Sequence, residues 1–364
     1  MKIERNIFSL EALTTCSGAV LRDVRIGYEM YGRLNAARDN ALLVCHYFAG
    51  NAHAAGRYAE TDPLPGWWDA AIGPGKMFDT DHYCVICSDS LVNLNVRDGR
   101  TASTGPATLN RETGAPYGLT FPLVTITDMV RAQRALLDQL GIERLVAVAG
   151  PSAGAMQALE WSVEFPECVP RVVAVVPPGL RMHPYAGAVM DCWARQILTD
   201  ADWCGGHYSP ERPPRKGLVE AFRLMNLTAL SFSAVERIAG TGWADPALNP
   251  GEALDHEFAA DAMLGALAAP RAEVTDANHL LYMTRACKLF DVTKRLARAK
   301  AKYLLAPAES DQLFVPALSE AALAQLRAAG LEAELVLVPG QGGHLDGLMR
   351  LDSIRDAVWR FLSG

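Results

Sequence analysis

The sequence lacks several features that would direct its function toward membranes or nucleic acids. No stretch approaches the roughly 18–20 consecutive apolar residues that cross a bilayer. Lysine and arginine form no run, and the net charge is −7, which argues against nucleic acid or an anionic membrane as a partner. The first residues alternate charged and apolar types too soon for a secretory signal, so we expect a cytoplasmic protein.

Metal-binding cysteine patterns are also missing. The eight cysteines are scattered, and the one C-x-x-C pair, Cys84 and Cys87, lies in a segment that reads as a buried strand. No second pair follows at zinc spacing, so we expect buried free thiols and neither a metal site nor a cofactor.

What the chain does contain is an alternation of strand and helix patterns. Half of its 364 residues are hydrophobic, enough for a large core. Buried strands are expected at 41–48, 83–89, 144–150, 171–177, 301–311 and 333–340. Helices are expected at 153–164, at 316–329 and from about 351. A further helix should begin after a cap at Thr127 and end at Gly141. The alternation predicts an α/β fold with a mostly parallel central sheet.

The alternation breaks in one long segment. Between about 179 and 297 no convincing buried strand occurs, and helical patterns dominate. We therefore expect a core formed by 1–178 and 298–364, with 179–297 inserted as a helical lid over the strand ends that carry the active-site loops.

Ser152 stands in Gly150-Pro151-Ser152-Ala153-Gly154, which fits the G-x-S-x-G motif. A predicted strand precedes it and a predicted helix follows, the context of the nucleophile elbow in α/β-hydrolases. In that turn large neighbours would clash with the strained serine backbone, which explains the small residues. The alternative is an ordinary glycine-bracketed turn.

A serine hydroxyl needs a base and an orienting acid, expected in the chain order Ser, acid, His. His344, in a glycine-rich loop after a strand, is the only histidine beyond His279. Asp311 is the preferred acid by position, with Glu309 and Asp346 as competitors and helix capping as its plainer role.

The oxyanion of the reaction needs two backbone donors. Ala153 should supply one, and Phe48 or Ala49, after the strand 41–48, the other. His46 and His53 flank this loop but precede the serine, so we interpret them as shaping the loop.

At this point the residues resemble a known group. The stretches "STGPATLNRETGAPYG", "GPSAGAMQALEWSVEFPE" and "DANHLLYMTRACKLFD" look like the homoserine O-acetyltransferase branch of the α/β-hydrolase superfamily. The resemblance runs from about Ala41 to the C-terminus. It implies a hydrolase core with a helical lid that often mediates dimers, the triad Ser152, Asp311 and His344, and Phe48 as second oxyanion donor.

The sequence departs from that family at its substrate contacts. A lid arginine of the family falls on Phe222, a tyrosine on Ala229, and the carboxylate after the histidine on Leu345. Arg223 would point about 100° away on a helix, and a misalignment by one residue is the alternative. The chain also has a few extra residues in "DSLVNLNVRDGRTASTGP".

These losses favour a member of the esterase type. A zwitterionic amino acid would leave its charges unpaired in an apolar site. The preferred hypothesis is a serine carboxylesterase that hydrolyses short-chain esters, such as acetates of small uncharged alcohols, as a homodimer joined through its lid. The alternatives are an acetyl-CoA-dependent O-acetyltransferase acting on homoserine, serine or another alcohol, and a hydrolase-fold binding protein without catalysis.

Overall fold

The computed structural model describes residues 3–364 and centres on an eight-stranded sheet. The strand order is β1-β2-β6-β3-β9-β10-β11-β12, parallel from β6 to β12 and antiparallel at the β1–β2 edge. The strands are β1 (Arg5–Thr14), β2 (Val20–Tyr31), β3 (Ala41–Cys45), β6 (Cys84–Ser88), β9 (Ala147–Pro151), β10 (Arg171–Val175), β11 (Lys302–Ala306) and β12 (Ala333–Leu335), with the short pairs β4 (Ile72–Gly73) and β5 (Phe78–Asp79), and β7 (Leu109–Asn110) and β8 (Ala115–Pro116). The expected mostly parallel sheet is confirmed.

Helices cover both faces of this sheet. The α-helices are α1 (Ile126–Gln139), α2 (Ala153–Glu164), α3 (Pro184–Leu198), α4 (Arg215–Ala229), α5 (Phe232–Ala239), α6 (Ala259–Val274), α7 (Ala277–Lys288), α8 (Pro316–Ala328), α9 (Asp346–Met349) and α10 (Arg355–Ser363). Apolar residues of α1, α2 and α8 share one core with alternate strand residues such as Leu43 and Val148, and α10 packs against the opposite set, such as Leu42 and Ala147. Because both faces are buried, the parallel strands read as continuous apolar runs.

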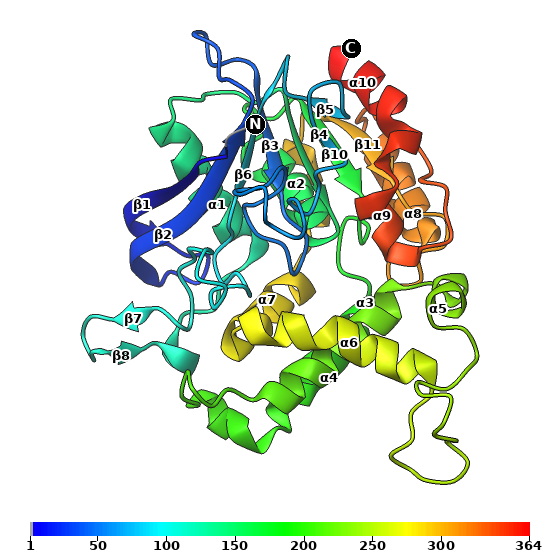
Figure 1. Cartoon of the computed structure of the whole chain (residues 1–364). Coiled ribbons are helices and arrows are strands. Elements are labelled where there is room, and N and C mark those ends of the chain that lie inside the picture. The colour runs from blue at the N-terminus through cyan, green and yellow to red at the C-terminus, as the bar shows by residue number, and fades with distance from the viewer. Residues whose placement is uncertain (1–2) are drawn as a thin grey trace.

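The helices α3 to α7 interrupt the sheet between β10 and β11, where the sequence analysis expects a lid. Figure 1 shows α3, α4, α6 and α7 gathered at one end of the sheet. Within residues 3–364, no strand of a sheet lies in this stretch. The division into a core and a lid stays a prediction, but the helical character of the insertion is confirmed.

Several predicted boundaries were wrong. The first helix begins at Ile126, because Thr125 caps it through a reciprocal bond with Asp128. Thr127 is therefore not the cap, and its hydroxyl contacts Glu160 instead. The strand expected at 333–340 ends at Leu335, and the β1–β2 hairpin was not anticipated.

Cys84 and Cys87 both lie buried in β6. Burial raises the pKa of the Cys84 thiol to about 11 and raises that of Cys87 as well. Neither forms a disulfide. Both are therefore protonated core residues near neutral pH.

Among the described residues no single helix has the length and apolar composition to cross a membrane; only the sharply bent pair of α4 and α5 passes such a test when the two are taken together.

Candidate active site

Ser152 occupies a strained turn between β9 and α2. Its φ and ψ are 58° and −117°, in the positive-φ region that non-glycine residues rarely adopt. A Cβ on Gly154 would lie 2.1 Å from the Cys45 carbonyl oxygen, and one on Gly150 would lie 2.6 Å from the Gly154 carbonyl oxygen. The glycines thus let the turn approach β3 closely, as a nucleophile elbow requires.

Asp311 and His344 meet at the same edge of the sheet. The Nδ1 atom of His344 lies 2.6 Å from Asp311 Oδ2, and both side chains are buried. The other carboxylate oxygen of Asp311 accepts the N–H groups of Leu313 and Phe314. Asp311 does not cap α8, whose N-cap is Val315. The carboxylate is therefore fixed by two backbone donors and in turn fixes the imidazole.

The competing acids lie elsewhere. Asp346 accepts a hydrogen bond from Gly342 N at 2.7 Å and so closes the glycine-rich loop onto α9. Glu309 contacts the N–H of Gly340. Neither carboxylate contacts His344 among the side chains of residues 3–364, which leaves Asp311 as the one that does.

Ser152 and His344 open into one cavity of about 180 Å³. No hydrogen bond joins them directly, and the buried Nε2 of His344 has no partner within residues 3–364. A base nitrogen without a partner in the cavity that holds the serine is compatible with proton transfer between them, since catalytic hydrogen bonds are often loose without substrate.

Phe48 and Ala49 line the same cavity. Ala153 is the first residue of α2, so its N–H has no acceptor within the helix. The N–H of Phe48 donates no hydrogen bond to any described residue. The serine turn and the loop after β3 pack closely together. Each of these two segments thus has one backbone N–H group, of Ala153 and of Phe48, without an acceptor among the described residues.

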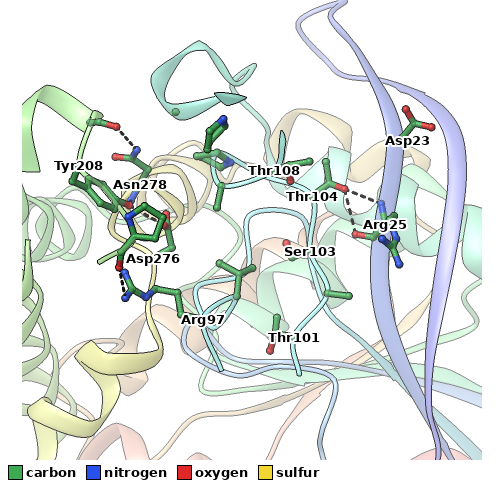
Figure 2. Close-up of a pocket in the computed structure, with 18 residues that line it drawn as sticks. Asp23, Arg25, Arg97, Thr101, Ser103, Thr104, Thr108, Tyr208, Asp276 and Asn278 are labelled. Atoms are coloured by element: carbon green, nitrogen blue, oxygen red, sulfur yellow. Dashed lines mark hydrogen bonds between the residues drawn. The ribbon is translucent and has the colours of Figure 1, made fainter. Parts of the chain in front are cut away.

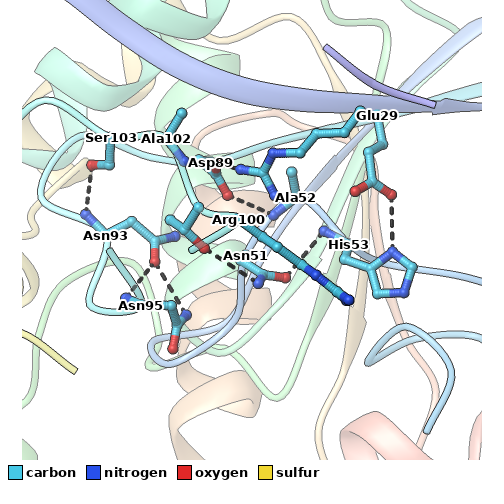
Figure 3. A network of polar contacts seen from close by, with 12 residues as sticks. Glu29, Asn51, Ala52, His53, Asp89, Asn93, Asn95, Arg100, Ala102 and Ser103 are labelled. Carbon is cyan, nitrogen blue, oxygen red and sulfur yellow. Dashed lines mark hydrogen bonds and ion pairs between the residues drawn. The ribbon is translucent and has the colours of Figure 1, made fainter. Parts of the chain in front are cut away.

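A buried polar network supports this loop from behind, and Figure 3 shows the part of it around Asp89, Asn93 and Asn95. The Nε2 atom of His46 accepts the N–H of Ser90 at 3.1 Å, and its Nδ1 faces the Tyr47 carbonyl at 2.7 Å. Burial lowers the pKa of His46 to about 4. The amide of Asn95 donates to the carbonyls of Ala49 and Gly50. The segment "DSLVNLNVRDGRTASTGP" therefore contributes to the scaffold of the loop through Ser90 and Asn95.

His53 belongs to the same scaffold, since its Nδ1 lies 3.0 Å from the buried Glu29 carboxylate and its ring does not line the cavity. The structure thus agrees with the interpretation of both early histidines as shaping the loop.

The predicted substrate residues Phe222, Ala229 and Leu345 all line the cavity, and Arg223 does not. Trp193, Met225, Leu313 and Leu348 add further apolar wall. No Asp or Glu side chain lines it among the described residues. Sequence reasoning missed one charged lining residue, Arg271 of α6, because nothing in its spacing links it to a loop 222 residues earlier.

A separate cavity of about 550 Å³ contains none of these residues. Figure 2 shows its polar lining already engaged: Tyr208 donates to Asp276 at 2.8 Å, and Arg25 N donates to Thr104. The first contact joins two parts of the inserted segment, and the second joins β2 to the loop at 101–108; no histidine is among the described residues that line this cavity.

Comparisons with known proteins identify the fold and the family of the chain. The model of the alpha/beta hydrolase fold matches residues 40–349. The homoserine O-acetyltransferase of Symbiobacterium thermophilum is 42% identical over 95% of this chain and 90% of its own length. The chain belongs to the homoserine O-acetyltransferase family of α/β-hydrolases.

Solved members of this superfamily share the whole architecture. The structure of esterase E22 covers 99% of this chain and 100% of its own, with a TM-score of 0.95 and 40% identity. The homoserine O-acetyltransferase from Bacillus anthracis covers 100% of this chain and 98% of its own, with a TM-score of 0.94 and 32% identity. The relatives therefore include proteins named as acetyltransferases and a protein named as an esterase. The names of the curated relatives favour acetyl transfer over hydrolysis as the reaction of this family.

Proposed function

We propose that this family member forms an acyl-enzyme on Ser152 and passes the acyl group to water, as a short-chain carboxylesterase. The observation that carries the proposal is the wall of the cavity beside Ser152, where Phe222, Ala229 and Leu345 stand and none of the described residues contributes a carboxylate. An ammonium group of an amino acid acceptor would be buried there without an anionic partner.

In the proposed reaction the Ser152 hydroxyl attacks the ester carbonyl while His344 Nε2 takes its proton. The C–O bond to the alcohol then breaks, and His344 returns the proton to the departing alcohol. Asp311 holds the imidazole and stabilises its charged form. The N–H groups of Ala153 and Phe48 bind the oxyanion.

In the second half of the reaction water attacks the acyl carbon, and His344 accepts one of its protons. The acid departs, and Ser152 recovers its hydroxyl proton from His344. Atoms and charge balance without a metal or an organic cofactor. The similarity to esterase E22 supports this half of the proposal.

Acetyl-CoA-dependent acetylation of homoserine, serine or another alcohol is the second candidate. It uses the same acyl-enzyme, and the names of the curated relatives support it more strongly than they support hydrolysis. The two candidates differ only in which acyl donor enters and which hydroxyl attacks the acyl-enzyme.

Two assays on the same protein separate the candidates. In one, p-nitrophenyl acetate or an alkyl acetate is the substrate; in the other, acetyl-CoA with homoserine or serine. We expect ester turnover that Ser152→Ala abolishes, and no CoA release that depends on the acceptor. Acceptor-dependent CoA release without ester turnover would favour the second candidate over the first. Absence of activity in both assays would favour a binding protein.

A further inference from the structure

Arg271 is a cation in the wall of a mostly apolar cavity, whose other polar lining residues are Tyr47, Ser152, Asn226 and His344. It projects from α6 and lines the same 180 Å³ space as Ser152 and His344. Its guanidinium carbon lies 5.8 Å from the ring centroid of Phe222 and over the ring. Phe222 is the residue that stands where the resemblance places a lid arginine. The site therefore has one fixed positive charge, supplied by a different helix.

The guanidinium is held in place from one side. Its Nη2 donates to the Ala49 carbonyl and to Asn95 Oδ1, the latter at 2.9 Å. Asn95, labelled in Figure 3, is 2% exposed and is itself fixed by the carbonyls of Ala49 and Gly50. A cation positioned in this way loses little further freedom when it binds a ligand.

The charge of Arg271 is not neutralised by the protein. No carboxylate within residues 3–364 forms an ion pair with it, and the nearby Glu273 of the same helix pairs with Arg215. Its Nη1 and Nε atoms have no hydrogen-bond acceptor among the described residues. Two donors of a planar guanidinium are thus free, and carboxylates match such a fork.

We propose that Arg271 binds a carboxylate of the substrate, so that the preferred esters are monoanions without an amino group. This inference rests on the proposed hydrolysis and refines its substrate class: the sequence analysis expects an uncharged alcohol, whereas the cavity offers one cation and no acid. A carboxylate gains an ion-pair partner there, whereas the ammonium of a zwitterion would find no carboxylate among the described lining residues. The carboxylate belongs either to the alcohol part or to the acyl part of the ester.

Matched ester pairs test the inference and distinguish the two positions. One pair is 3-acetoxypropionate and its methyl ester; the other is monomethyl succinate and dimethyl succinate. We expect the wild type to show a higher kcat/KM for the anion in at least one pair, by about 10- to 100-fold, as for one charge-assisted interaction. Arg271→Gln should remove that preference while neutral esters lose much less.

Arg223→Gln is the matched control, since Arg223 is another lid arginine but lies outside the cavity and pairs with Glu220. It should keep the preference for anions. The inference is overturned if neutral esters are hydrolysed as well as the anions in both pairs, or if Arg271→Gln lowers both members of a pair equally. Neutral hydrolysis would then still stand, whereas absence of all ester turnover would refute the proposed function itself.

Discussion

Two glycines determine how closely the serine turn approaches β3. Any side chain at Gly154 would overlap the Cys45 carbonyl oxygen, which belongs to backbone and has little room to move. The same close packing places the loop that carries Phe48 beside Ser152. The motif is therefore a steric requirement on the path of the chain as well as a marker of chemistry.

Gly154→Ala should disturb this packing. We expect kcat/KM for a simple acetate ester to fall by about 100-fold or more, because small displacements of reacting groups are costly, with a loss of about 1–3 kcal/mol in stability from overpacking. Gly242→Ala is the control, since a Cβ there meets nothing within 4 Å. Equal activity of the two variants would show that the turn tolerates a wider approach.

His46 should make stability depend on pH. Burial of the ring lowers its pKa to about 4 in the fold, despite the opposing effect of the Tyr47 carbonyl, against about 6.5 when unfolded. Between these values the unfolded chain binds more protons, so the stability that neutral His46 contributes is present above pH 6.5 and is lost as pH falls toward 4, by about 1.4 kcal/mol per pKa unit.

The measurement is urea unfolding of the wild type and His46→Gln at several values between pH 7.5 and 4.5. The variant lacks this titration, so its difference in free energy of unfolding from the wild type should shrink as pH falls. A difference that stays constant across the range would mean that the pKa of His46 is the same in the folded and the unfolded chain.

Single residues differ in how far the sequence could identify them. Ser152, Asp311 and His344 could be predicted because each follows a strand in an order that the fold repeats. Arg271 could not, because its contact with Ala49 depends on how α6 crosses the cavity and leaves no local pattern. The predicted roles of the triad residues stay predictions. The structure adds that Ser152 and His344 line one cavity and that Asp311 contacts His344.

At the scale of elements, α4 carries Phe222 and Ala229, two of the three residues on which the proposed preference for water over an amino acid acceptor rests. Phe222 is buried and lies beneath the Arg271 guanidinium. We expect that Phe222→Arg alone will not give homoserine acetylation, because it sets two cations together and leaves Ala229 and Leu345 unchanged. Acetyl-CoA consumption with homoserine is the measurement, and clear acetyl transfer by the single variant would refute this account of specificity.

Buried elements were predicted better than exposed ones. The helix α2 was predicted with its observed bounds, and β3, β6, β9, β10 and β11 were found because parallel strands buried on both faces read as apolar runs. The β1–β2 hairpin alternates buried and exposed residues at the open edge of the sheet, so charged positions masked it. Strand ends were overestimated because apolar character continues into the loops that line the site.

The whole molecule presents an apolar groove on its lid side. It measures about 710 Å³ and is lined by Tyr185, Leu227 and Phe232, the last of which is 84% exposed. Such a patch is typical of protein contacts. The homodimer expected from the sequence stays a prediction, and this groove is the surface on which it can be tested.

Phe232→Asp should shift a dimer to monomer in sedimentation velocity, because a charge would be buried at the contact. Leu64→Asp, also exposed but far from the lid in the chain, should leave the sedimentation coefficient unchanged. If the wild type is monomeric at all concentrations tested, the predicted homodimer is refuted.

The central claim is that acetylated Ser152 gives its acetyl group to water. The direct measurement is to acylate the enzyme with p-nitrophenyl acetate in the presence of increasing homoserine and to quantify acetate and O-acetylhomoserine by mass spectrometry. The account predicts that acetate accounts for nearly all of the p-nitrophenol released at every homoserine concentration. O-Acetylhomoserine that rises with homoserine at the expense of acetate would contradict it.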